Sequence, residues 1–202
     1  MNVLKFWVAP LLAAGLLAAC ASPSPAPVLL TLPPAAAPLA SAAPGNAAAS
    51  PLLAVRRVNI PEYLVSRRVR YRADASTLAE WPNTFWAERI EIGVSREFVS
   101  ALRQQLPGWA LCDTNCGDAV PALSLQVDLL PMDFVRSAGR LQARARIVLS
   151  TGSVPPRELK TQELSYDLPA GGDTAQAHAQ AISQLLRQVA QAVAPTVRDA
   201  PR

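Results

Sequence analysis

The sequence predicts an α+β fold, in which an antiparallel β-sheet carries two main helices packed on one face, preceded by a signal peptide and a Pro/Ala-rich tether. Three runs in the second half of the chain alternate apolar and polar residues, which is typical of strands that bury one face of an antiparallel sheet. Two longer stretches repeat apolar residues every three or four positions, which is typical of amphipathic helices. These periodicities define the predicted layers.

Residues 1–19 have the organisation of a secretory signal peptide. Lys5 supplies a positive charge near the start, and residues 6–19 contain no charged side chain. This apolar run is shorter than the roughly 20 residues that a helix needs to span a bilayer. It ends in Leu17-Ala-Ala-Cys20, the lipobox pattern of bacterial lipoproteins. An ordinary signal peptide that happens to end at a cysteine is the alternative.

Cys20 is therefore the predicted lipidation site. Its thiol would accept a diacylglyceryl group, and cleavage before it would free the amine for an N-acyl chain. Two or three acyl chains anchor a protein firmly, and no other cofactor is expected. Ala21 follows, rather than the aspartate that favours retention in the inner membrane. We therefore expect an outer-membrane anchor with the domain facing the periplasm.

Residues 20–51 form the predicted tether, because residues 21–51 carry no charge and eight prolines. Within it, the β-prone residues 28–32 are a candidate first strand. Residues 52–197 are long enough for one domain with its own core, and residues 198–202 are expected to be a polar tail.

The first half of this domain predicts two strands and a helix. Leu53–Ile60 and Arg67–Arg72 are expected to pair like a β-hairpin around the corner that Pro61 begins. Residues 73–84 are expected to be irregular, with Asn83 or Thr84 capping a helix over 85–106.

The second half predicts a meander and a closing helix. A short strand over 109–112 leads to the three alternating runs, which are residues 123–129, 141–149 and 163–168. The last helix is expected over 173–193, with Asp173 as its cap and Pro195 as its end.

The net charge is +4, and arginine supplies most of the positive charge. An exported protein rarely meets nucleic acid, so anionic lipid head groups or an acidic protein partner are preferred ligands. The alternative is that these arginines form the solvent-exposed face of a strand and bind no partner. The candidate partner- or lipid-facing residues are Arg67, Arg68, Arg70, Arg72, Tyr63 and Trp86. Plain core packing is the alternative role for Tyr63 and Trp86.

Once Cys20 is assigned to lipid, Cys112 and Cys116 remain. An even pair in an oxidising compartment predicts a disulfide. Zinc is the alternative, but it would need further ligands, and the chain has one histidine, His178.

No catalytic constellation emerges from the sequence. His178 falls among glutamines and alanines on the polar part of the last helix, where an exposed surface histidine is expected. We therefore predict a protein that is not an enzyme.

An ordered set of segments resembles a known family. The carrying features are the lipobox at Cys20, the strand Leu29–Leu32, the segment Val58–Leu64, the basic strand Arg67–Arg72 and Trp86–Ile90 at the predicted helix start. Together they resemble the ABC-type transport auxiliary lipoproteins, the PqiC/YmbA-like group. The sequence departs from the family in having leucine at Leu29 or Leu30 in place of an early tyrosine, and a longer Pro/Ala stretch over 33–51.

The resemblance implies a non-enzymatic component of a lipid-transport system across the cell envelope. Its implied partners are an Mce-domain protein with an inner-membrane permease and ATPase, and a homo-oligomer is compatible with it. The alternative function is a structural or pilot-type envelope lipoprotein without a transport role.

Overall fold

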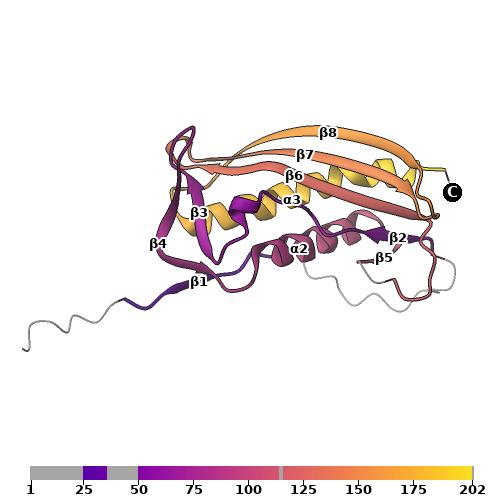
Figure 1. Ribbon diagram of the computed structural model, residues 1–202, viewed down its shortest axis with the longest axis horizontal. Coiled ribbons are helices and arrows are strands. Elements are labelled where there is room, and N and C mark those ends of the chain that lie inside the picture. The colour runs from indigo at the N-terminus through magenta and orange to yellow at the C-terminus, as the bar shows by residue number, and fades with distance from the viewer. Residues whose placement is uncertain (1–24, 36–49, 114–115, 202) are drawn as a thin grey trace, which may run out of the picture.

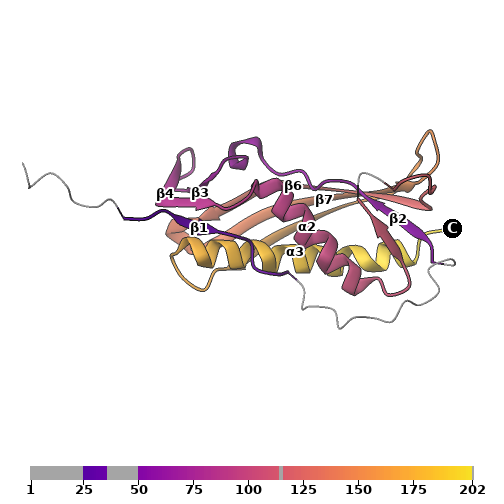
Figure 2. The ribbon, with the colours of Figure 1, turned by 90° about the horizontal axis from the view of Figure 1, so that it is seen from below.

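The computed structural model describes residues 25–35, 50–113 and 116–201 as two layers, a sheet and two helices that cover one of its faces (Figures 1 and 2). The helices are α2 (Ile90–Gln105) and α3 (Ala175–Arg198). The strands are β1 (Val28–Leu30), β2 (Leu52–Val55), β3 (Arg68–Arg72), β4 (Leu78–Trp86), β5 (Ala110–Cys112), β6 (Leu123–Val135), β7 (Arg140–Thr151) and β8 (Glu158–Pro169). The α+β class is confirmed.

The eight-stranded sheet is mixed, so the prediction of an antiparallel sheet is wrong in part. Strands β6, β7 and β8 do form the predicted antiparallel meander. However, β1 pairs with β4 in parallel, and β2 pairs in parallel with both β5 and β6. Alternating hydrophobicity determines which face of a strand is buried, but it contains no information about the direction of the neighbouring strand.

The predicted hairpin between the first two strands of the domain is also wrong. Both β2 and β3 pair with β6, and β3 pairs otherwise with β4. After Val55 the chain continues along β6, where the amides of Arg56 and Asn59 donate to the carbonyls of Leu125 and Val127 at 2.8 and 3.0 Å. Strands β2 and β3, which were predicted to pair with each other, both pair with the long strand β6 instead.

Residues 78–84 of the segment expected to be irregular belong to strand β4, and the helix after it begins at Ile90 rather than at residue 85. The amide of Trp86 donates to the carbonyl of Arg67 at 2.6 Å, which keeps Trp86 in the sheet. Neither Asn83 nor Thr84 caps the helix, since the side chain of Asn83 donates to the carbonyl of Pro25 and that of Thr84 donates to the carbonyl of Pro82 within β4. Sheet pairing therefore overrides the helical pattern at this boundary.

The closing helix is longer than predicted. Thr174, not Asp173, is the N-cap, and its hydroxyl accepts from the amide of Ala177 at 3.0 Å. Pro195 lies inside the helix, which continues to Arg198.

Residues 25–35 form a strap that is part of the folded unit. The candidate first strand is present as β1, and the side chains of Leu30, Leu32 and Ala35 are buried. The amide of Ala35 donates to Glu97 of α2 at 3.0 Å, and Ser183 of α3 donates to the carbonyl of Pro33 at 2.7 Å. The folded unit therefore extends beyond residues 52–197 at both ends, and part of the expected tether is fixed to the domain.

Candidate functional site

The arginines of β3 are largely neutralised by carboxylates on adjacent strands. Arg68 and Arg70 both pair with Glu80 of β4, at 3.3 and 3.2 Å, and Arg72 pairs with Asp133 of β6 at 3.0 Å. Glu80 lies directly opposite Arg70 in the antiparallel register, a position where opposite charges stabilise a sheet. Arg67, just before β3, is exposed.

Tyr63 belongs to the same network. Its hydroxyl donates to Asp133 at 3.0 Å, and the Arg72 guanidinium lies 5.7 Å from the centre of its ring. Burial and the Asp133 carboxylate raise the pKa of Tyr63, while the hydrogen bond to Asp133 raises the pKa of Arg72. Tyr63 therefore stays a protonated donor, and the network fastens the corner before β3 onto β6.

Trp86 lies in the core rather than on a surface, with 4% of its area exposed. Its ring centre is 6.3 Å from that of His178, which in turn lies 4.7 Å from the ring of Phe134. Tyr63 and Trp86 thus do not form one exposed corner.

His178 is buried, with 3% of its area exposed, so the prediction of a surface histidine is wrong. Small alanines on both sides of it let this turn of α3 approach the sheet closely, a packing that an apolar-stripe analysis does not detect. Nδ1 has no hydrogen-bond partner among the described residues, and loss of solvation lowers the pKa of His178 from 6.5 to about 3. The imidazole is therefore neutral at physiological pH.

Cys112 and Cys116 are disulfide-bonded, as predicted. The bond lies at the end of β5, where Cys112 is in register with Ala54 of β2. Asp113 and Cys116, the described residues of the loop that this bond closes, line one wall of the groove described next.

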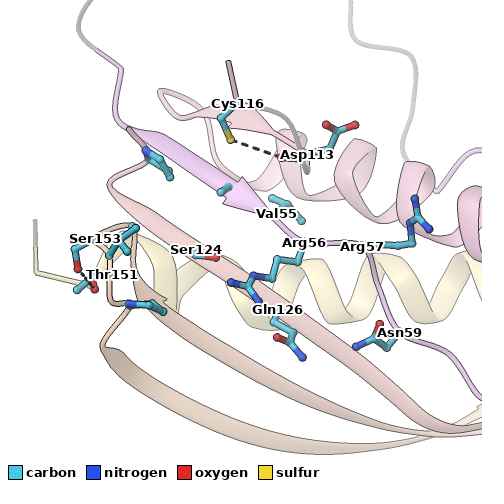
Figure 3. Close-up of a pocket in the computed structure, with 15 residues that line it drawn as sticks. Val55, Arg56, Arg57, Asn59, Asp113, Cys116, Ser124, Gln126, Thr151 and Ser153 are labelled. Carbon is cyan, nitrogen blue, oxygen red and sulfur yellow. Dashed lines mark hydrogen bonds between the residues drawn. The ribbon is translucent and has the colours of Figure 1, made fainter. Parts of the chain in front are cut away.

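A solvent-open groove of about 680 Å³ lies between this loop, the residues that follow β2, and the β7–β8 hairpin (Figure 3). Ser124 and Gln126 of β6 line it together with Arg56 and Asn59. Gly152 allows the hairpin to approach, because a side chain there would collide with the carbonyl of Pro121. A second cavity of about 470 Å³ borders α2 and shares Arg56 and Arg57 with the groove.

Arg56 and Arg57 distinguish this groove from the β3 face. Both are exposed, and within the described part of the chain neither forms an ion pair with a carboxylate. Their side chains diverge, with Arg56 reaching across β6 near Gln126 (Figure 3). Neither arginine was a predicted site residue, because both fall inside the predicted strand Leu53–Ile60, although two adjacent arginines were a visible signal.

The groove presents the guanidinium groups of Arg56 and Arg57 together with one carboxylate, that of Asp113. Across residues 25–35, 50–113 and 116–201, no cluster of three or more His, Cys, Asp or Glu side chains could hold a metal ion. No helix in these ranges has the length and apolar character needed to cross a membrane. Residues 1–19 and the predicted lipid site Cys20 lie outside the described residues.

The family model of the ABC-type transport auxiliary lipoprotein component matches residues 30–194. The chain therefore belongs to this family, as the ordered set of segments suggested. The family's name indicates a lipoprotein and implies association with an ABC-type transport system.

Solved structures share the fold. A crystal structure of an uncharacterized protein aligns with a TM-score of 0.67 at 19% identity, covering 86% of this chain and 99% of that one. The crystal structure of protein XCC0632 from Xanthomonas campestris, of the DUF330 family, aligns with a TM-score of 0.58 at 18% identity, covering 86% and 93%. No protein with a curated description is significantly similar to the chain.

Proposed function

We propose that this protein is a non-enzymatic adaptor of an Mce- and ABC-type lipid-transport system, anchored to the outer membrane through Cys20. The family match over residues 30–194 carries the proposal. The lipobox before Cys20 and the uncharged Ala21 after it support the anchor and its membrane. The partners would be an Mce-domain protein and, through it, the inner-membrane permease and ATPase.

The groove beside Arg56 and Arg57 is the proposed docking surface for an acidic segment of the Mce-domain protein. Two exposed arginines without carboxylate partners can pair with incoming carboxylates without first breaking internal ion pairs. The β3 arginines offer less, because Glu80 and Asp133 already engage three of them. Strand β2, which borders the groove, lies at the end of the domain opposite β1 and so away from the proposed anchor (Figure 1).

A non-enzymatic role is supported by the placement of His178. It is the only histidine of the chain and it is buried against aromatic rings, so a substrate at the surface would not reach it.

In-cell photocrosslinking tests the adaptor role. A photoreactive amino acid at Arg57 should capture the Mce-domain protein, whereas one at Gln191, exposed on α3, should capture much less. Recovery of neither an Mce-domain protein nor a permease would contradict the transport role. Recovery of a secretion or assembly subunit would instead support the pilot-type alternative.

A further inference from the structure

The first residues of the strap are hydrogen-bonded to β4. The side-chain amide of Asn83 donates to the carbonyls of Pro25 and Ala26 at 2.8 and 3.0 Å. Asn83 has a positive φ of 49°, a conformation that asparagine tolerates better than most residues. Two residues further on, β1 begins its parallel pairing with β4. The chain is therefore already attached to the domain at Pro25.

This attachment limits the distance between the domain and a lipid on Cys20. Pro25 is five residues after Cys20, and a fully extended chain spans at most about 3.6 Å per residue, or roughly 18 Å in all. A lipidated Cys20 would thus hold Pro25 within roughly 18 Å of the bilayer surface. Of the tether expected over residues 20–51, only the few residues before Pro25 separate the proposed lipid from the first attachment to the domain.

The surface at this end of the sheet is amphipathic. Leu29, Phe85 and Arg68 are in register across β1, β4 and β3, and they form a row on the face opposite to the buried Leu30 and Trp86. Leu29 is 58% exposed, and the Arg68 guanidinium lies 5.3 Å from the centre of the Phe85 ring.

Basic groups surround this row. Together with Arg67 and Arg70, it borders a shallow hollow of about 560 Å³. Glu80 is the acidic side chain lining that hollow, against three arginines, so the surface keeps a positive balance. Exposed apolar side chains rimmed by arginines are typical of surfaces that rest at the interface of an anionic bilayer.

We infer that the β1–β4–β3 surface rests on the phospholipid head groups, with Leu29 and Phe85 against the apolar boundary and the exposed Arg67 on a lipid phosphate. The inference depends on the proposed lipidation of Cys20, since the few residues before Pro25 direct this end to the bilayer. It also orients the domain, because β2, which leads into Arg56 and Arg57, lies at the end opposite β1 (Figure 1) and would face away from the bilayer.

Depth-dependent fluorescence quenching tests this orientation. The lipidated mature protein is prepared as Leu29→Cys or, as the matched control, Val154→Cys, which is 96% exposed on the β7–β8 hairpin. Because Cys112 and Cys116 are bonded to each other and the Cys20 sulfur carries lipid, the new thiol is the single reactive site for a fluorophore. Each sample is reconstituted in vesicles of phosphatidylethanolamine and phosphatidylglycerol that contain a head-group spin label.

We expect several-fold stronger quenching at position 29 than at position 154. Arg67→Glu should weaken the quenching at position 29, whereas Arg56→Glu should leave it unchanged. Equal or weaker quenching at position 29 in a protein whose N-terminal peptide carries the lipid mass would overturn the inference and leave the anchor proposal standing. Absence of the lipid mass from Cys20 would overturn the anchor proposal, and the inference with it.

Discussion

The two ends of this domain use arginine differently. At the β1–β4–β3 end, Arg68, Arg70 and Arg72 are paired with carboxylates on neighbouring strands. At the groove end, Arg56 and Arg57 are exposed and have no carboxylate partner among the described residues. The residue type is the same at both ends, and the difference arises from what the neighbouring strand presents. A cluster of arginines in a sequence therefore becomes a candidate docking surface only when its cross-strand neighbours are known.

The largest expected change in the free energy of unfolding comes from the loss of core packing at the β1–β4–β3 end. Trp86→Ala removes a buried ring and should lower the free energy of unfolding by about 3–5 kcal/mol. Denaturant titration followed by circular dichroism would measure it. Phe85→Ala, on the opposite face and only partly buried, is the control and should cost clearly less. Equal losses would contradict the assignment of Trp86 to the core.

Acid should weaken the same end through His178. The pKa of His178 is lowered to about 3 in the fold, against an ordinary value of 6.5, so the unfolded chain binds a proton that the folded chain does not. Above pH 6.5, His178 is neutral in both states and does not reduce the free energy of unfolding. Between pH 6.5 and pH 3, that free energy falls by about 1.4 kcal/mol per pH unit. Unfolding free energies of the protein and of His178→Phe, measured across this range, should diverge as pH falls. Parallel pH profiles would show that His178 is not buried as a neutral imidazole.

Loss of the Tyr63–Asp133–Arg72 network should have a smaller effect. Asp133→Asn leaves the partly buried Arg72 without its charge partner and should cost about 1–3 kcal/mol of unfolding free energy. Glu80→Gln, which removes more exposed ion pairs, should cost about 0–1 kcal/mol. Thermal unfolding of the two variants side by side would measure the difference. The reverse order would mean that the network does not hold the corner before β3.

The smallest effect on stability is expected at the groove. Arg56→Ala and Arg57→Ala should change the unfolding free energy by no more than about 0.5 kcal/mol, because both side chains are exposed and unpaired. The same substitutions should reduce in-cell crosslinking to the Mce-domain protein several-fold. Unchanged crosslinking in folded variants would contradict the groove as the docking surface. The surface around Arg67 and Arg68 would then be the next candidate.

Sequence periodicity predicted some elements well and others poorly. The alternation in β6 and β7 identified the buried face, and Leu125 and Leu149 point into the core as expected. The helical pattern before Ile90 was misleading, because the amide of Trp86 donates to Arg67 and the amide of Ala87 donates to Leu30, two distant residues whose positions no local pattern contains. His178 was misplaced for a similar reason, since small alanines lower local hydrophobicity while allowing close packing.

The candidate surfaces were only partly predictable. The arginines of β3 were noticed, but their neutralisation depends on Glu80 and on the distant Asp133. The groove is built from Arg56, Gln126, Cys116 and Ser153, which lie far apart in the chain and meet through parallel pairing and one hairpin.

The sequence by itself determined the Cys112–Cys116 pairing, the meander and the apolar stripe of the last helix. It also predicts the lipobox at Cys20. Each of these depends on residues close together in the chain, where spacing alone defines the chemistry or the buried face. Only the tertiary structure decided that the strap is fixed to β4, that β2 and β3 share β6, and which arginines are paired. Hydrogen bonding and ion pairing between strands join residues whose separation in sequence has no bearing on their distance in space.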